Sequence, residues 1–129
     1  YRAYAKTELG DYEGAIRDYE SSTAHAPDEI MAFNNLAYLL ACCPDPQLRN
    51  GRLAIFFATS ACRHTDWKDW TSLATLAEAH AENGTFQDAI KWQKDAIAVA
   101  PPPLQASLRE RLKLYQAGKP FRLQATKGR

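Results

Sequence analysis

The amino-acid sequence predicts an all-α fold, an α-α superhelix built from antiparallel helical hairpins. Three observations support this prediction: one phrase occurs twice in the same register, apolar residues recur at helical spacing, and glycine or proline ends those stretches. The phrases are LGDYEGAIRDYESSTAHAP, residues 9–27, and NGTFQDAIKWQKDAIAVAP, residues 83–101. Their matched positions lie 74 residues apart: Gly10 and Gly84, Tyr12 and Phe86, Ala15 and Ala89, Ile16 and Ile90, Pro27 and Pro101.

That spacing predicts a further unit between the two phrases. Two repeats of about 34 residues, the period of helix-turn-helix solenoids, leave a few of the 74 residues to place. Residues 44–50 hold two prolines, so they are the expected insertion. We therefore expect one domain over residues 1–129. Its parts are units at about 1–29, 30–69 and 70–102, followed by a capping helix and basic tail at 103–129.

The first two expected helices each follow an aspartate that can cap them. Residues 12–25 carry apolar or small side chains at helical spacing, with Asp11 as the N-cap and Pro27 as the stop. The next helix, over residues 30–42, follows Asp28 and carries an apolar stripe along one face.

The remaining helices are expected after the insertion. Residues 52–64 resume helical spacing, and the last unit combines helices at 70–83 and 86–99 with Thr85 as the cap between them. A final helix over residues 104–117 has one apolar face, formed by Leu104, Leu108, Leu112 and Tyr115. It would cover the hydrophobic side that a terminal repeat otherwise exposes.

The repeated positions have physical reasons. Gly10 and Gly84 fall where the chain reverses after a helix, which favours the left-handed conformation that costs glycine little. Ala15 and Ala89 fall where two helices cross closely, so a larger side chain would push the helices apart. We expect these sites to be constrained and the residues between them to vary.

A small-residue helix, a Gly-Asp-Tyr type of turn, Ala-Ile on the second helix and a closing proline resemble the tetratricopeptide repeat (TPR) family. The resemblance is strongest over residues 70–101, good but truncated at the front over 1–27, and degenerate over 30–67. It implies helical hairpins whose first helices line a concave groove. Family members use that groove to hold extended peptides or partner helices, so the expected function is a non-catalytic protein-protein interaction scaffold.

Carried over residue by residue, the resemblance implies a peptide-binding groove lined by the first helix of each unit. Its expected residues are Tyr4, Glu8, Met31, Asn34, Asn35, Tyr38, Thr71, Thr75, Glu78 and Glu82, with Tyr1, Thr7, Ala41, Cys42, Ala74 and Ala81 beside them. No lysine or arginine occurs in this set, so we expect a neutral or basic partner rather than an acidic one. The commoner explanation of such glutamates is solvated helix surface, and it stays open.

Some TPR proteins clamp a terminal carboxylate with lysine, arginine and asparagine at fixed groove positions. Asn35 matches one asparagine of that pattern, but Tyr4 replaces the other. Thr71 and Thr75 stand where the cations would be needed. The resemblance therefore does not imply a carboxylate clamp in this chain.

Catalytic and metal-binding motifs are weak. Cys42, Cys43, Cys62 and His64 lack the usual Cys-x-x-Cys spacing, so we expect buried thiols and no metal. His80 is expected to turn toward the packing layer rather than to serve as a catalytic base. We find no Ser/His/Asp grouping, glycine-rich phosphate loop or cofactor motif. The sequence predicts neither an enzyme nor a cofactor.

Three tryptophans could form an aromatic cage for a ligand. Tryptophans at helical spacing are more often part of a core. We therefore expect Trp92 on a packing helix, and Trp67 and Trp70 at the junction that opens the last unit.

Composition bounds the setting of the protein. The chain has 129 residues, 46% of them hydrophobic, which suits a single domain. Its three cysteines do not form an even disulfide framework, so a reducing compartment, the cytoplasm, is expected. No apolar run could span a membrane. The first residue is Tyr1 and the first repeat is truncated, which suggests a piece of a longer protein.

The charge distribution leaves two alternatives open. The net charge is +1, but the chain from residue 109 onward holds seven Lys or Arg against Glu110 alone. That basic tail could contact nucleic acid, although Phe121 is the single residue there able to stack on a base. Two copies could also form a homodimer, either through the face of the truncated first repeat or with one basic tail in the acidic groove of the other.

Overall fold

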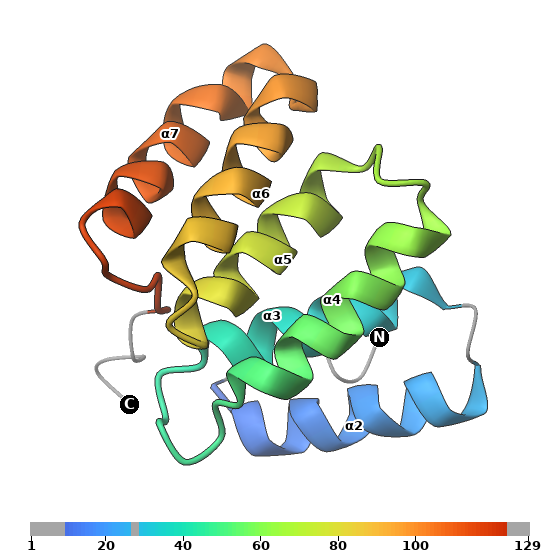
Figure 1. Ribbon diagram of the computed structural model, residues 1–129. Helices are drawn as coiled ribbons and strands as arrows, with labels where there is room; N and C mark the ends of the chain where they lie inside the picture. Colours follow the sequence, from blue (N-terminus) through green and yellow to red (C-terminus); the bar gives the residue numbers. More distant parts are fainter. Residues whose placement is uncertain (1–9, 27–28, 124–129) are drawn as a thin grey trace.

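The computed structural model describes residues 10–26 and 29–123, and within these ranges the protein is entirely helical (Figure 1). The described helices are α2 Tyr12–His25, α3 Ile30–Cys42, α4 Gly51–His64, α5 Trp70–Glu82, α6 Phe86–Val99 and α7 Pro102–Gln116. The expectation of an all-α fold is confirmed for this part of the chain. The helix bounds agree with the expected ranges to within about two residues, the usual uncertainty of a helix end.

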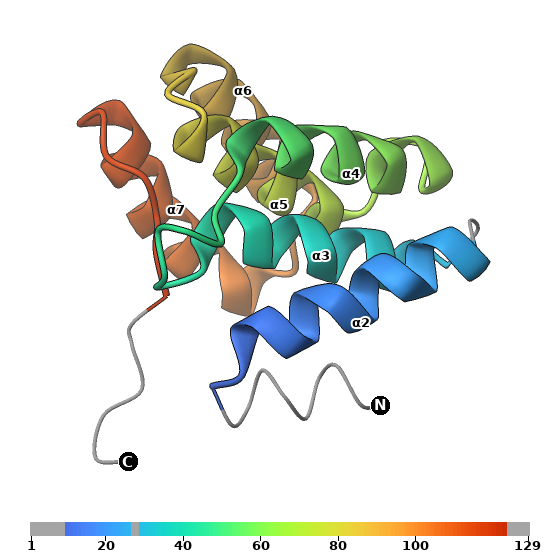
Figure 2. The same ribbon diagram turned by 90° about the horizontal axis from the view of Figure 1, so that it is seen from below.

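The helices pack mainly in the order of the chain. Each helix packs against the next, and α3 also packs against α5. Figure 2 shows α2, the pair α3 and α4, the pair α5 and α6, and then α7 following one another across the molecule. The core is divided accordingly into three clusters of buried residues, centred on α2–α4, on α3–α6 and on α5–α7.

Local signals account for most helix starts. Asp11 caps α2 as expected, because its Oδ1 accepts the backbone N–H of Gly14 at 3.0 Å. Asn50 caps α4 and Asp69 caps α5 in the same way, through Leu53 N–H and Ser72 N–H. A side-chain acceptor at each of these starts satisfies an amide that the helix leaves without a partner.

The structure does not show side-chain capping by two of the expected N-caps, Thr85 and Asp28. Thr85 does occupy the N-cap position of α6, but its side chain makes no capping bond. Its hydroxyl instead donates back to the carbonyl of His80 at 3.0 Å, so the prediction of its capping role is wrong. Asp28 and Pro27 lie outside the described residues, and the N-cap of α3 is Glu29, which makes no side-chain capping bond.

The repeated positions take the conformations expected of them. Gly10 has φ +86° and Gly84 has φ +83°, both in the left-handed region. Gly84 follows the end of α5, so residues 83–85 suffice to turn the chain into α6. Ala15 and Ala89 are fully buried, as close helix crossings require. No helix in the described ranges has both the length and the apolar character needed to cross a membrane.

A candidate binding groove between α3, α5 and α7

A pocket of about 360 Å³ lies where α3, α5 and α7 face one another. Its lining residues are Asn34, Asn35, Tyr38, Trp70, Thr71, Ala74, Thr75, Glu78, Leu104, Ser107, Leu108 and Arg111. The lining combines amide, hydroxyl and charged side chains with the apolar side chains of Trp70, Ala74, Leu104 and Leu108. A volume of this size accommodates a small ligand or a few residues of an extended peptide.

Seven of the expected groove residues line this pocket: Asn34, Asn35, Tyr38, Thr71, Ala74, Thr75 and Glu78. They lie on α3 and α5 at successive turns, so one face of each helix points toward the same space. Met31 is 72% exposed at the start of α3 and is not part of the lining. Glu82 lies beyond the lining, at the end of α5. Tyr4 and Glu8, with Tyr1 and Thr7, fall outside the described residues.

The contribution of α7 was missed in the sequence, where this helix was expected only to cap the fold. Leu108 and Tyr115 are buried as expected of a cap, but Leu104 remains 37% exposed and lines the pocket. Ser107 and Arg111 stand one turn apart on the same side. The sequence showed that Ser107 and Arg111 share one face of this helix, but it did not show that this face lies against α3 and α5.

The two glutamates on α5 are paired, so the explanation of solvated helix surface is wrong for both. Glu78 is only 2% exposed, and its Oε2 accepts a hydrogen bond from Nη1 of Arg111, whose side chain is 29% exposed. Glu82 binds Nε of Arg49 at 3.3 Å and Nη2 of Arg122 at 2.9 Å. The expectation that the lining contains no arginine is wrong, because Arg111 is part of it. Since Arg111 pairs with Glu78, this glutamate gives the groove no unpaired negative charge.

Burial dominates the electrostatics of the groove floor. It raises the pKa of Glu78 from 4.5 to about 7, although the Arg111 guanidinium opposes the shift. Burial, together with the Glu78 carboxylate, also raises the pKa of the phenols of Tyr38 and Tyr115. The Oε1 atom of Glu78 is buried and finds no hydrogen-bond partner within the described ranges.

We expect Glu78 to make stability depend on pH. Because its folded pKa of about 7 exceeds the ordinary 4.5, its stabilising contribution is complete below about pH 4.5 and is lost as pH rises through 7. As the pH falls from about 8 to about 4.5, the free energy of unfolding of the wild type should therefore rise by on the order of 3 kcal/mol relative to that of Glu78→Gln. Urea unfolding of both proteins over this range measures the difference.

Comparing the wild type with Glu78→Gln cancels the contributions of other titrating groups to the pH dependence of stability. Burial lowers the pKa of His80, so its protonation destabilises the fold on acidification, but both proteins contain it and the contribution cancels. Tyr38, Cys42 and Tyr115 have raised pKa values and stay neutral over this range. A stability difference that is constant with pH would contradict the assignment to Glu78.

The cysteines are free and buried. Burial raises the pKa of each thiol, and that of Cys62 reaches about 12. Thiols in this state are poor nucleophiles and poor metal ligands. Across residues 10–26 and 29–123, no three or more His, Cys, Asp and Glu side chains gather in a group that could hold a metal ion.

His80 lies beside the turn between α5 and α6, and its side chain is only 16% exposed. Its Nδ1 lies 2.9 Å from the Thr85 hydroxyl and 4.0 Å from a carboxylate oxygen of Asp88. The side chain therefore belongs to the turn rather than to the groove.

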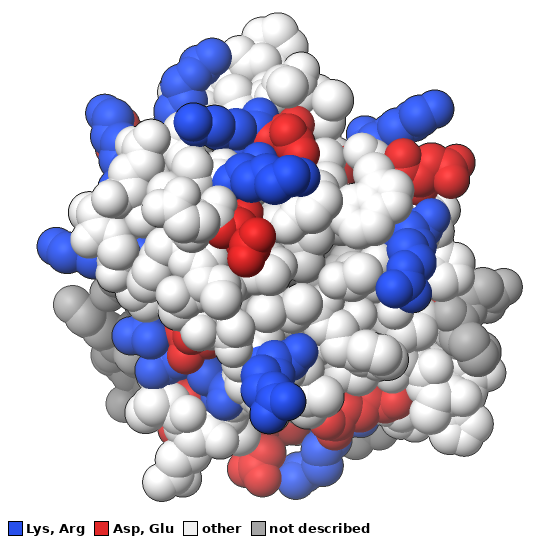
Figure 3. Space-filling model, viewed as in Figure 1, with Lys and Arg blue, Asp and Glu red and all other residues white. Residues whose placement is uncertain are grey.

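Of the five described Lys and Arg residues from Arg109 onward, three form ion pairs within the chain. Arg111 and Arg122 bind Glu78 and Glu82, and Lys113 binds Glu110 at 3.2 Å. On the face shown in Figure 3, Lys and Arg side chains are spread among Asp and Glu and gather in no single patch. Phosphate binding relies on cations that are free to pair, so this arrangement weakens the nucleic-acid alternative.

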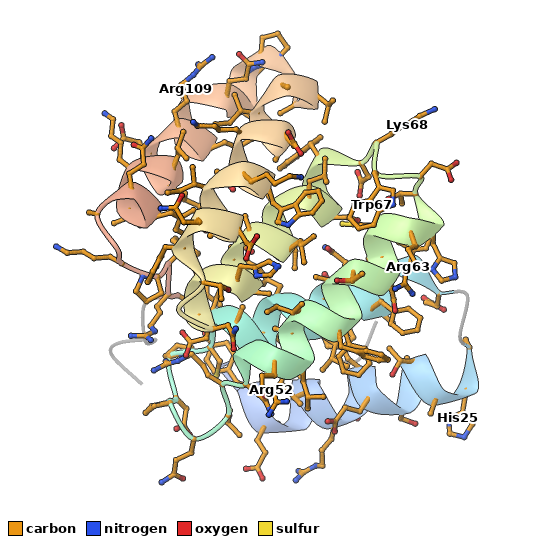
Figure 4. All side chains as sticks on the ribbon, viewed as in Figure 1. His25, Arg52, Arg63, Trp67, Lys68 and Arg109 are labelled. Atoms are coloured by element: carbon orange, nitrogen blue, oxygen red, sulfur yellow. The ribbon has the colours of Figure 1, made fainter. Side chains whose placement is uncertain are left out.

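The tryptophans divide between two places. Trp67, in the connection between α4 and α5 (Figure 4), stacks on Trp92 of α6 with ring centroids 5.2 Å apart. Nζ of Lys91 lies 3.5 Å from the centre of the Trp92 ring. Trp70 packs against the second cluster and also lines the pocket, which extends its expected role at the junction.

No family model matches the chain, and no curated protein is significantly similar to it. The chemistry of the groove therefore rests on its own residues.

Proposed function

We propose that this chain is a TPR-like superhelix that acts as a non-catalytic scaffold and holds an extended partner segment between α3, α5 and α7. The observation that carries the proposal is the pocket of about 360 Å³, in which polar side chains of α3, α5 and α7 lie beside the apolar side chains of Trp70, Leu104 and Leu108. The alternation of lining and backing helices along the chain supports the superhelix, because α3 reaches α5 across α4.

The lining chemistry suits a peptide main chain. Asn34 and Asn35 each carry an amide that can both donate to and accept from a backbone. Trp70, Leu104 and Leu108 offer an apolar surface for one side chain of the segment.

Charge pairing selects against an acidic partner. Glu78 is already neutralised by Arg111, so an acidic segment gains no unpaired cation there and brings its own charge toward a buried carboxylate. A neutral or basic segment of a protein is the proposed partner. A cytoplasmic location accords with the three free cysteines, since a reducing compartment keeps thiols unpaired.

To test this function, peptides that bind the whole chain are selected from a random library, and their affinity is measured for the wild type and for a groove variant. In the double variant Asn35→Ala/Tyr38→Ala, affinity for the best selected peptide should fall by about tenfold or more, because two groove contacts are removed. Fluorescence anisotropy with a labelled peptide measures the change, and circular dichroism checks that the variant is folded.

The matched control changes two exposed residues of α6. Gln87→Ala/Lys94→Ala lies outside the pocket lining and should bind like the wild type. Equal affinity of the folded groove variant and the wild type would refute binding in this groove.

A further inference from the structure

The chain turns back at the end of α7 and covers a surface next to the open pocket. Gly118 has φ +72°, and the N–H of Lys119 donates to the carbonyl of Leu114 at 2.9 Å, a glycine-dependent helix ending. Pro120 follows and prevents further helix. Figure 2 shows the segment after α7 running back past the end of α3. We call residues 119–123 the strap.

Contacts of several kinds hold the strap. The N–H of Leu123 donates to the carbonyl of Cys42 at 2.8 Å, which joins the strap to the end of α3. The ring of Phe121 packs against the first and third clusters and lies 3.8 Å from the guanidinium carbon of Arg111. Arg122 binds the carboxylate of Glu82 through both Nε and Nη2. The Leu123 side chain also packs against the first cluster, so the strap uses a backbone bond, an aromatic ring, a cation and an aliphatic side chain.

The strap lies where a groove ligand was expected. The strap contacts the backbone carbonyl of Cys42 and the carboxylate of Glu82, two residues that the sequence placed on the groove lining. Arg111 connects the two regions, since it lines the open pocket and also faces the Phe121 ring. The strap therefore covers a surface next to the open pocket, and Arg111 contacts both.

We infer that the strap is a ligand bound in cis, and that the surface beneath it accepts in trans a partner segment with consecutive aromatic, basic and aliphatic residues. The inference rests on the proposed function of the groove and specifies its partner. An aromatic ring satisfies the cationic face of Arg111, and a guanidinium or ammonium group satisfies Glu82. A partner segment that binds this surface must replace the strap.

The strap is suited to replacement. Within the described residues, a single backbone hydrogen bond joins it to another helix, and the Arg122 side chain is 45% exposed. No residue of the strap is fully buried, and segments at the edge of the core open more readily than the core itself. When the strap leaves, Glu82 keeps its bond to Arg49, so the open state does not strand a buried charge.

The test uses an amidated peptide with the sequence GKPFRL, residues 118–123, as the probe. The full chain with Phe121→Ala/Arg122→Ala should bind this peptide about tenfold or more tightly than the wild type does. In the wild type the tethered strap competes at an effective concentration in the millimolar range. The same peptide with alanine in place of phenylalanine should not bind the variant. Isothermal titration calorimetry measures all three affinities.

Arg109→Ala/Lys113→Ala, on the exposed side of α7, is the matched control and should behave like the wild type. A second measurement is hydrogen exchange of the Leu123 amide in the wild type, which the bond to Cys42 should slow by about tenfold or more. Equal peptide affinity of the strap variant and the wild type, or an unprotected Leu123 amide, overturns the inference. A concentration-dependent dimer that vanishes in the strap variant would place the strap in the groove of a second copy and overturn binding in cis.

These outcomes separate the inference from the proposed function. Peptides selected for the open pocket depend on Asn35 and Tyr38, and their binding does not require the strap to leave. Failure of the GKPFRL peptide with retained pocket binding refutes the inference alone. Loss of pocket binding in every assay refutes the proposed function.

Discussion

Replacing Arg111 with methionine should destabilise the fold by about 3 kcal/mol near pH 8, because the replacement leaves the buried Glu78 carboxylate without its cation. The reverse deletion should cost less, since Arg111 is partly exposed and can turn toward water, whereas Glu78 is 2% exposed. Glu78 can take up a proton, which keeps the cost at the low end of the range for broken buried pairs. Urea unfolding measures the loss.

The loss should shrink near pH 5, where Glu78 is neutral in the folded state and needs no cation. Arg109→Met is the matched control on the same helix. Arg109 projects from α7 away from the fold (Figure 4), and its replacement should change stability by less than about 0.5 kcal/mol. The double variant Glu78→Leu/Arg111→Met should recover most of the stability, because no buried charge remains. Equal losses in the Arg109 and Arg111 variants would show that the ion pair contributes nothing.

Replacing Ala89 with leucine should destabilise the fold by about 3 kcal/mol, at the upper end of the usual cost of overpacking. Ala89 is completely buried and packs in the third cluster with Ala77 and Ala81 of α5 and with Tyr115 of α7. Three helices meet at that residue, so added carbons must separate α6 from at least one neighbour. Thermal and urea unfolding measure the loss.

Ala98→Leu is the control, since Ala98 is exposed on the same helix and leucine is also a good helix former. Its stability should stay within about 0.5 kcal/mol of the wild type. Ala15→Leu, at the matched position of the first phrase, should behave like Ala89→Leu because Ala15 is also fully buried. If both buried positions tolerate leucine as well as Ala98 does, the close crossing inferred from the repeated phrase is wrong.

The helix starts and ends could be predicted because they depend on neighbouring residues. Asp11 caps α2 through Gly14, three residues along the chain, and Pro101 separates α6 from α7. Thr85 shows the limit of such reasoning. Its hydroxyl had both the α6 amides and the His80 carbonyl within reach, and the geometry of the turn selected the carbonyl.

The groove residues on α3 and α5 could be predicted, but the residues that face them from other parts of the chain could not. The resemblance carried over residue by residue implied Asn34, Tyr38 and Thr75 as groove residues, and they line one pocket. Helical spacing gave Glu78 and Glu82 a common face, but it could not show that either glutamate was paired with an arginine. Their arginines come from α7, from the loop before α4 and from the strap, between 33 and 40 residues away in the chain.

The sequence by itself determined that this chain folds into helices, where each helix begins and ends, and that glycine and alanine occupy fixed points of a repeated unit. These properties follow from backbone conformation and side-chain spacing within a few residues. Only the tertiary structure decided that α7 lines the groove, that Arg111 neutralises Glu78 and that the strap covers the surface next to the open pocket. Contacts of this kind depend on how separate helices pack, because burial and charge pairing are set by whatever side chains the fold brings together.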